Sequence, residues 1–123
     1  MHTKIELTHL ATVQVGKLAH EPADLKQLIS AKLAHIPGVR SAHLTGFKFK
    51  DSTEQAHPAI GLYHRGNYQE ILAAIEPILK VWCEENKRLV DVFDMNEQSS
   101  MQSHFRKEPP FYKRSWFRRM LNR

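Results

Sequence analysis

The sequence predicts a small α+β domain in which one antiparallel sheet carries two helices on one face. The expected element order, β-α-β-β-α-β, is that of a ferredoxin-like sandwich, and a short helix and tail follow at the C-terminus. Two observations support this prediction. Segments with the alternating pattern of strands are separated by two segments with the apolar spacing of helices. The length of 123 residues suits one domain.

The first strand and the first helix are recognised from their patterns and their ends. Residues 12–15 alternate polar and apolar side chains, as a strand does, and Gly16 follows them. Glu21-Pro22 then opens a helix, because proline is tolerated in the first helical turn. Pro37-Gly38 ends this helix. Its apolar residues recur on one face: Leu25, Leu28, Ile29 and Leu33.

A hairpin is expected next. Residues 39–50 read as a strand in which Phe47 and Phe49 alternate with lysines, so that one face is apolar. Residues 51–55 form a polar turn, and residues 57–64 form the second strand of the pair.

The second half of the domain repeats the helix-strand order. Asn67 is a candidate cap for a second helix, with Glu70 three residues later in a pattern similar to a capping box. Pro77 interrupts this helix and should kink or restart it. Residues 89–93 read as the last strand, and residues 99–105 as a short helix. The apolar face of the long helix consists of Ile71, Ile75, Ile78, Leu79 and Trp82.

The net charge of +5 is concentrated at the C-terminus. Residues 106–123 hold seven basic residues and one acid, whereas residues 1–105 hold eleven basic and twelve acidic residues. We therefore divide the chain into one domain over residues 1–114 and a basic amphipathic tail over residues 115–123. A short tail helix would place Trp116 and Phe117 opposite Arg118 and Arg119, which favours docking on a protein over binding to lipid.

Several short motifs resemble the C-terminal domain of the SseB family, the enhanced serine sensitivity proteins. They are VQVGK, EPADLKQLISAKLAHIPGVRSAHL, HPAIGL, LVDVFDM and PFY, and they span roughly residues 13–114. The resemblance implies the α+β fold and a structural role for Pro109–Tyr112, whereas a catalytic residue set is not part of the family pattern. Proteins of this family usually carry another domain before this one, and the tail is longer than their usual ending.

The residues that could carry chemistry are scattered. The eight histidines include neither an i, i+4 pair nor an H-x-H pair, so we predict no metal site. Cys83 is expected to pack on the second helix as a small apolar residue. Asp91 and Asp94 should point to opposite faces of their strand and cannot act as an acid–base pair. Neither a glycine-rich phosphate loop nor a nucleophile elbow occurs. We therefore predict no enzyme activity and no cofactor.

The predicted function is that of a non-catalytic protein-interaction or regulatory module that acts through its sheet face and C-terminal segment. Phe47, Phe49 and Tyr63 lie either on the open face of the sheet or in the core beneath the helices. If they are exposed, this aromatic face, or pairing of edge strands between chains, would allow a homodimer. The single cysteine is typical of a cytoplasmic protein, and no apolar run is long enough for a membrane span. The candidate partner-binding residues are Phe47, Phe49, Tyr63, Phe111, Tyr112, Arg114, Trp116, Phe117, Arg118 and Arg119.

The alternative is an accessory nucleic-acid-binding protein. RNA-recognition domains have the same element order and stack bases on aromatic residues of their central strands. Here the third strand offers only Tyr63, and the expected first strand has no aromatic residue. The arginines and aromatic residues of the tail could still bind a single strand weakly and without sequence specificity.

Overall fold

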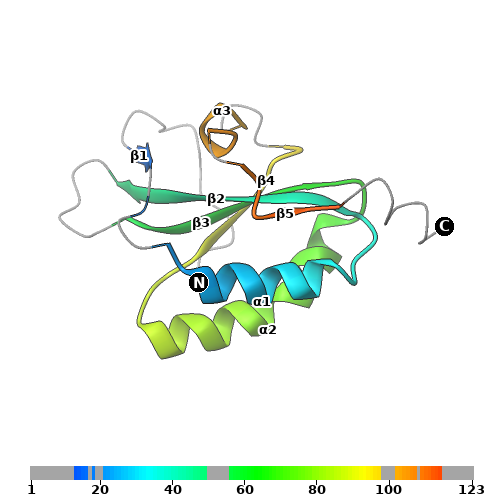
Figure 1. Ribbon diagram of the computed structural model, residues 1–123, viewed down its shortest axis with the longest axis horizontal. Helices are drawn as coiled ribbons and strands as arrows, with labels where there is room; N and C mark the ends of the chain where they lie inside the picture. The colour runs from blue at the N-terminus through cyan, green and yellow to red at the C-terminus, as the bar shows by residue number, and fades with distance from the viewer. Residues whose placement is uncertain are drawn as a thin grey trace.

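The structure is a computed structural model that describes residues 13–16, 18, 21–49, 56–97, 102–107 and 109–114. The α+β class predicted from the sequence is confirmed, because helices and strands alternate along the chain (Figure 1). The elements are β1 (Val13–Gly16), α1 (Ala23–Leu33), β2 (Val39–Phe49), β3 (His57–His64), α2 (Tyr68–Asn86), β4 (Asp91–Asp94), α3 (Gln102–Phe105) and β5 (Tyr112–Lys113).

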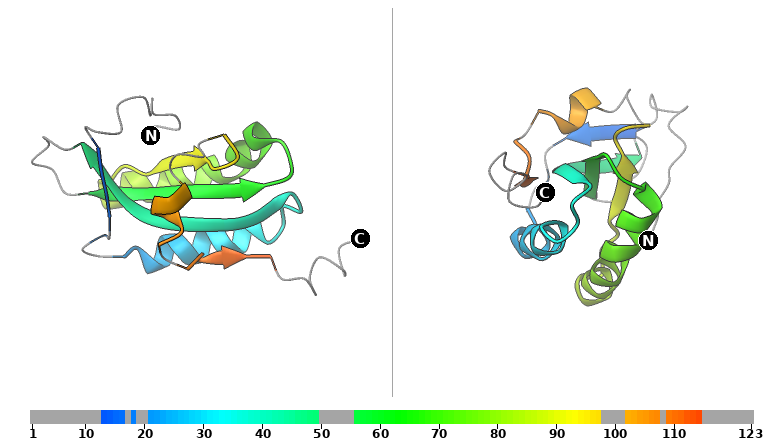
Figure 2. Two further views of the ribbon diagram at one scale, coloured as in Figure 1. Left: turned by 90° about the horizontal axis from the view of Figure 1, so that it is seen from above. Right: turned by 90° about the vertical axis from the view of Figure 1, so that its right-hand side faces the viewer.

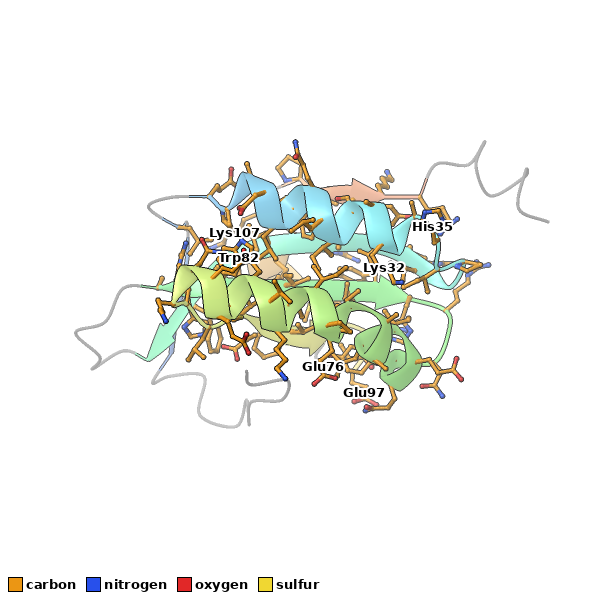
Figure 3. All side chains as sticks on the ribbon, turned by 90° about the horizontal axis from the view of Figure 1, so that it is seen from below. Lys32, His35, Glu76, Trp82, Glu97 and Lys107 are labelled. Atoms are coloured by element: carbon orange, nitrogen blue, oxygen red, sulfur yellow. The ribbon has the colours of Figure 1, made fainter. Side chains whose placement is uncertain are left out.

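Helix α1 buries one stripe of side chains, formed by Leu25, Ile29 and Leu33. Leu28 was expected on the same face, but its side chain is 49% exposed. The helix packs beside α2 and runs antiparallel to it (Figure 3). At one end of this contact, Trp82 Nε1 donates a hydrogen bond of 3.0 Å to the Asp24 carboxylate, which ties the start of α1 to the last turns of α2.

Helix α2 begins at the predicted cap. The Asn67 side chain accepts hydrogen bonds from the backbone N–H groups of Gln69, at 2.9 Å, and Glu70, at 3.2 Å. The helix continues through Pro77, so it does not restart there, although its axis bends part-way along (Figure 1). It ends at Lys87, whose φ of 54° is left-handed. The buried residues of α2 are Ile71, Leu72, Ile75, Leu79 and Trp82.

The sheet is mixed, with the strand order β1-β2-β3-β4. The predicted hairpin is confirmed, since β2 and β3 pair antiparallel from Val39 opposite His64 to Phe47 opposite His57. β3 and β4 pair in parallel, with Ala59 opposite Asp91. β1 and β5 both pair antiparallel with β2, along the edge that β3 leaves free.

The ferredoxin-like order is not confirmed. In that arrangement β1 would lie between β3 and β4 in an all-antiparallel sheet. Here β3 and β4 are direct neighbours, and the connection between them contains α2, which is long enough for the crossover that parallel strands need. β1 instead pairs with the end of β2. The observed and predicted sheets therefore differ in the position of β1, which lies at the edge and not between β3 and β4.

Two apolar clusters lie on opposite faces of the sheet. α1 and α2 cover one face, and α3 lies on the other (Figure 2). The larger cluster joins the two long helices to residues such as Leu44, Ile60 and Val92 of the strands. The smaller cluster contains Phe47, Ala59, Phe93, Met95 and Phe105.

Gly61 lies where α3 approaches the sheet. A Cβ atom at this position would be 2.8 Å from Cδ1 of Phe105 and 3.0 Å from Cγ of Met95. The absence of a side chain at Gly61 therefore lets the Phe105 ring lie directly on β3. In the part of the chain that the structure describes, no helix is long and apolar enough to cross a membrane.

Candidate functional site

The C-terminal segment, residues 109–114, lies along α1 and the edge of β2. The Phe111 N–H donates to the Ala42 carbonyl at 2.9 Å, and the Ser30 hydroxyl donates to the Phe111 carbonyl at 3.3 Å. Tyr112 is buried, and its hydroxyl donates to the Leu33 carbonyl at 3.4 Å. These contacts hold the segment against the domain, as predicted. Tyr112 was also predicted to bind a partner, but it is buried and therefore structural. The same prediction for Phe111, which is half-buried, stays a prediction.

Arg114 was predicted to contact a partner, but its side chain is 94% buried and bonded within the chain. Nη2 donates to the carbonyls of Ile36, at 2.8 Å, Leu33, at 3.3 Å, and Ala34, at 3.4 Å. Nε donates to the Val39 carbonyl at 3.1 Å. The last carbonyls of a helix have no partner within it and carry partial negative charge. Arg114 therefore caps the C-terminal end of α1 and the turn that follows, so it is a structural residue.

A pocket of about 320 Å³ opens beside the start of this segment. Its walls combine apolar side chains with an ion pair, in which Lys26 Nζ lies 2.7 Å from Glu21 Oε1. Such a mixture suits a ligand group that is apolar over most of its surface and polar at one end. The lining residues are Glu21, Lys26, Leu44, Pro109, Pro110 and Phe111.

The outer face of the sheet was predicted to be a partner surface, but α3 covers part of it. Phe47 is fully buried against Phe93 in the smaller cluster, so it cannot contact a partner in the folded protein. Tyr63 is half-buried, with the Arg106 guanidinium 4.9 Å from its ring centroid and the His43 ring at its edge. The Phe49 side chain lies outside the described residues.

The other predicted partner-binding residues belong to the tail. Trp116, Phe117, Arg118 and Arg119 lie outside the residues that the structure describes. The prediction of a contact through these four residues remains a prediction.

Two histidine–aspartate pairs join β3 to β4, and the sequence analysis did not anticipate them. His57 Nε2 contacts the carboxylate of Asp91, and His64 Nε2 lies 2.8 Å from Oδ1 of Asp94. Because Asp91 and Asp94 are three residues apart in one strand, the pairs lie on opposite faces of the sheet, as predicted for the two carboxylates. The sequence signal was the position of a histidine at each end of one strand, but the partner strand could not be assigned before the sheet order was known.

Asp91 is 1% exposed, and its Oδ1 atom has no hydrogen-bond partner among the described residues. Cys83 packs against the larger cluster, on the helix-covered face, whereas His57 contacts Phe47 on the other face. The sheet thus separates the thiol from the His57–Asp91 pair. Burial raises the pKa of the Cys83 thiol, which favours its protonated form. Within the described residues, no group of three His, Cys, Asp or Glu side chains could hold a metal ion.

Tyr68 lies beside the His64–Asp94 pair, with its ring centroid 5.8 Å from that of His64. Its hydroxyl donates to the Val92 carbonyl at 3.3 Å. Burial, followed by the negative charges of Asp94 and Glu97, raises the pKa of Tyr68 well above its usual value. The phenol is therefore held in its neutral form and acts as a hydrogen-bond donor.

Comparison with known proteins agrees with the motifs in the sequence. The family model of the SseB protein C-terminal domain matches residues 8–114. No curated protein and no solved structure gives a significant match. The matched range contains every helix and strand described above, together with Arg114, which caps α1. This chain therefore belongs to the SseB C-terminal domain family.

Proposed function

We propose that this protein is a non-catalytic protein-interaction module that recognises its partner through the C-terminal segment and the pocket beside it. The observation that carries the proposal is the pocket of about 320 Å³ between α1, β2 and residues 109–111. This volume lies at the lower end of the range for small-molecule sites, so it suits one large side chain of a partner.

The walls of the pocket favour recognition at a low entropic cost. Pro109 and Pro110 have a restricted backbone, and the hydrogen bond from Phe111 N–H to the Ala42 carbonyl fixes the segment to β2. A preorganised surface loses little conformational freedom when a partner binds. Leu44 supplies an apolar wall, and the Lys26 ammonium at the rim, held beside Glu21, can pair with a polar or acidic group next to the inserted side chain.

Phe47 has no part in this proposal, because it belongs to the smaller cluster of the core. The tail, residues 115–123, remains part of it, since the tail continues from the segment that borders the pocket. The lone cysteine is compatible with this role in the reducing cytoplasm.

Affinity capture with quantitative mass spectrometry from the native host tests the proposal. The tagged wild-type chain is compared with Lys26→Glu, which reverses the charge at the pocket rim, and with a chain truncated after Arg114. Lys80→Glu, an exposed position of α2, is the matched control. We expect one protein to be captured by the wild type and the control, and to be lost or strongly reduced with Lys26→Glu and with the truncation.

Capture of the same proteins in equal amounts by wild type and Lys26→Glu would refute the pocket as the recognition site. Equal capture by the truncated chain would remove the tail from the proposal. Circular dichroism spectra of all variants establish that the comparison is made between folded proteins.

A further inference from the structure

Five exposed basic side chains gather at one end of the molecule, away from the pocket. They come from the end of α1, the turn after it, the start of β2, the turn after β3, and β5. Lys32 and His35 are seen at this end in Figure 3. We call this surface the basic end, and it consists of Lys32, His35, Arg40, Arg65 and Lys113.

Backbone pairing brings three of these residues together from distant parts of the sequence. The Arg65 N–H donates to the Gly38 carbonyl at 2.7 Å, two residues before Arg40. On the other side of β2, Lys113 is the strand partner of Ser41, the neighbour of Arg40. Adjacent strands lie about 4.8 Å apart. Arg65, Arg40 and Lys113 therefore lie on three neighbouring segments of the chain, all at the same end of the sheet.

Arg114 increases the positive potential of the basic end from its buried position at the C-terminal end of α1. The exposed C-terminus of a helix carries about half a negative charge, which would oppose the approach of an anion. The Arg114 guanidinium binds the carbonyls of Leu33, Ala34 and Ile36 and offsets that charge. The end of α1 therefore does not weaken the attraction of the exposed basic residues for a negative ligand.

The cations of the basic end are not paired with carboxylates of the described residues. None of the ion pairs formed between described residues involves a residue of the basic end. The carboxylate of Asp94 already contacts the His64 ring. Glu76 and Glu97 lie on the α2 side of the molecule, away from His35 (Figure 3). Among the five basic residues, Arg65 is the one nearest to Glu97 in the fold, because the Asn96 side chain bonds the His64 carbonyl.

We propose that the basic end binds an acidic segment of a partner protein. The proposal rests on the proposed function and adds the chemistry of the partner to it. Guanidinium groups such as those of Arg40 and Arg65 bind carboxylates with two parallel hydrogen bonds. Single-stranded nucleic acid would in addition need exposed rings on which bases stack. Tyr112 is buried and Phe111 packs against the core, so the neighbouring segment does not offer its rings for stacking.

Fluorescence anisotropy with two probes of matched charge tests the proposal. One probe is a labelled peptide of ten glutamates and the other is a labelled ten-nucleotide uridine RNA. The full chain is compared with the triple variant Arg40→Gln/Arg65→Gln/Lys113→Gln. The matched control is Lys80→Gln/Lys87→Gln/Lys107→Gln, which removes the same number of exposed charges elsewhere.

We expect the peptide to bind the wild type at about 50 mM salt and to be released as salt screens the charges. An exposed ion pair contributes up to about fivefold in affinity, so the triple variant should bind about tenfold or more weakly, and the control should bind like the wild type. Arg40→Lys/Arg65→Lys keeps the charge and should retain part of the affinity, since only the paired hydrogen bonds are lost.

Three outcomes with the probes and variants above would overturn the proposal. They are no binding of the peptide at low salt, an equal loss of affinity in the triple variant and in its control, or RNA binding at least tenfold tighter than peptide binding. A further variant, Arg118→Gln/Arg119→Gln, separates the tail from the basic end, and an effect of this variant alone would also overturn it. Loss of a captured partner with Lys26→Glu, together with no binding of the peptide, would leave the proposed function standing and remove only this inference.

Discussion

Replacement of Arg114 by methionine tests whether its guanidinium caps α1 as described. The variant keeps an unbranched side chain of similar length but removes four hydrogen bonds to carbonyl groups. The bonds to Leu33 and Val39 are buried. The Leu33 carbonyl keeps the Tyr112 hydroxyl and the Ile36 N–H as donors, whereas the Val39 carbonyl would lose the Arg114 donor without gaining water.

A buried acceptor left without a partner costs roughly 1–2 kcal/mol, which is the loss expected for the Val39 carbonyl, and the three other lost bonds add about 1 kcal/mol. Removal of a buried charge, whose Nη1 has no partner, offsets part of this loss. We therefore expect the free energy of unfolding to fall by about 1–2 kcal/mol, and Tm to fall by roughly 5 °C.

Urea unfolding followed by circular dichroism measures the effect, with Lys113→Met as the matched control. Lys113 is exposed and adjacent in the sequence, so its replacement should change stability by no more than about 0.5 kcal/mol. Arg114→Lys should be intermediate, because one ammonium group cannot reach all the carbonyls that a guanidinium spans. Equal stability of the Arg114→Met and Lys113→Met variants would refute the capping role.

Three further predictions concern other parts of the fold. Gly61→Ala would push a methyl group to within 2.8 Å of the Phe105 ring, so we expect a loss of about 1–3 kcal/mol in urea unfolding. In a double-mutant cycle, Gly61→Ala should cost less free energy of unfolding when Phe105 is replaced by leucine. If the effects of the two substitutions on stability simply add, Gly61 and Phe105 are not in contact. Asn67→Ala removes the cap of α2 and should cost about 1 kcal/mol, whereas Asn67→Ser should be nearly neutral; equal losses would argue against capping. Because the pKa of Tyr68 is raised in the folded state, the unfolded chain releases this proton first as pH rises above about 10, and stability falls there. Tyr68→Phe should abolish this part of the alkaline loss and remove the last-titrating tyrosine from the absorbance curve at alkaline pH; an unchanged curve would contradict the burial of the phenol.

The sequence was a good guide to the elements, because each depends on local patterns. The apolar spacing that ends at Leu33, the cap at Asn67 and the alternation in β2 all act within a few residues. The sheet order depends on where β1 goes, and alternation of side chains says nothing about the partner of a strand. β3 and β4 run in the same direction in both the ferredoxin-like and the observed sheet. The helix α2 that connects them is therefore compatible with either strand order.

The candidate site was harder to predict than the fold. Arginine is common both on partner surfaces and at helix ends, and the sequence around Arg114 does not distinguish them. Phe47 was assigned to an open sheet face because helices were expected on the other face only, and the contact of Phe105 with Gly61 is not a local feature of the sequence. Phe111 and Tyr112 were easier, because two aromatic residues directly after two prolines favour a docked segment.

The edge of β2 that pairs with both β1 and β5 has a consequence for folding during synthesis. β1 pairs with one half of this edge and β5 with the other, and these strands lie near opposite ends of the described chain. The half of the edge at Ser41 and Ala42 must wait until nearly the whole domain has left the ribosome before β5 can pair with it. Until then its backbone groups are open to strands of other chains, so the final few residues of the domain protect the nascent protein from aggregation.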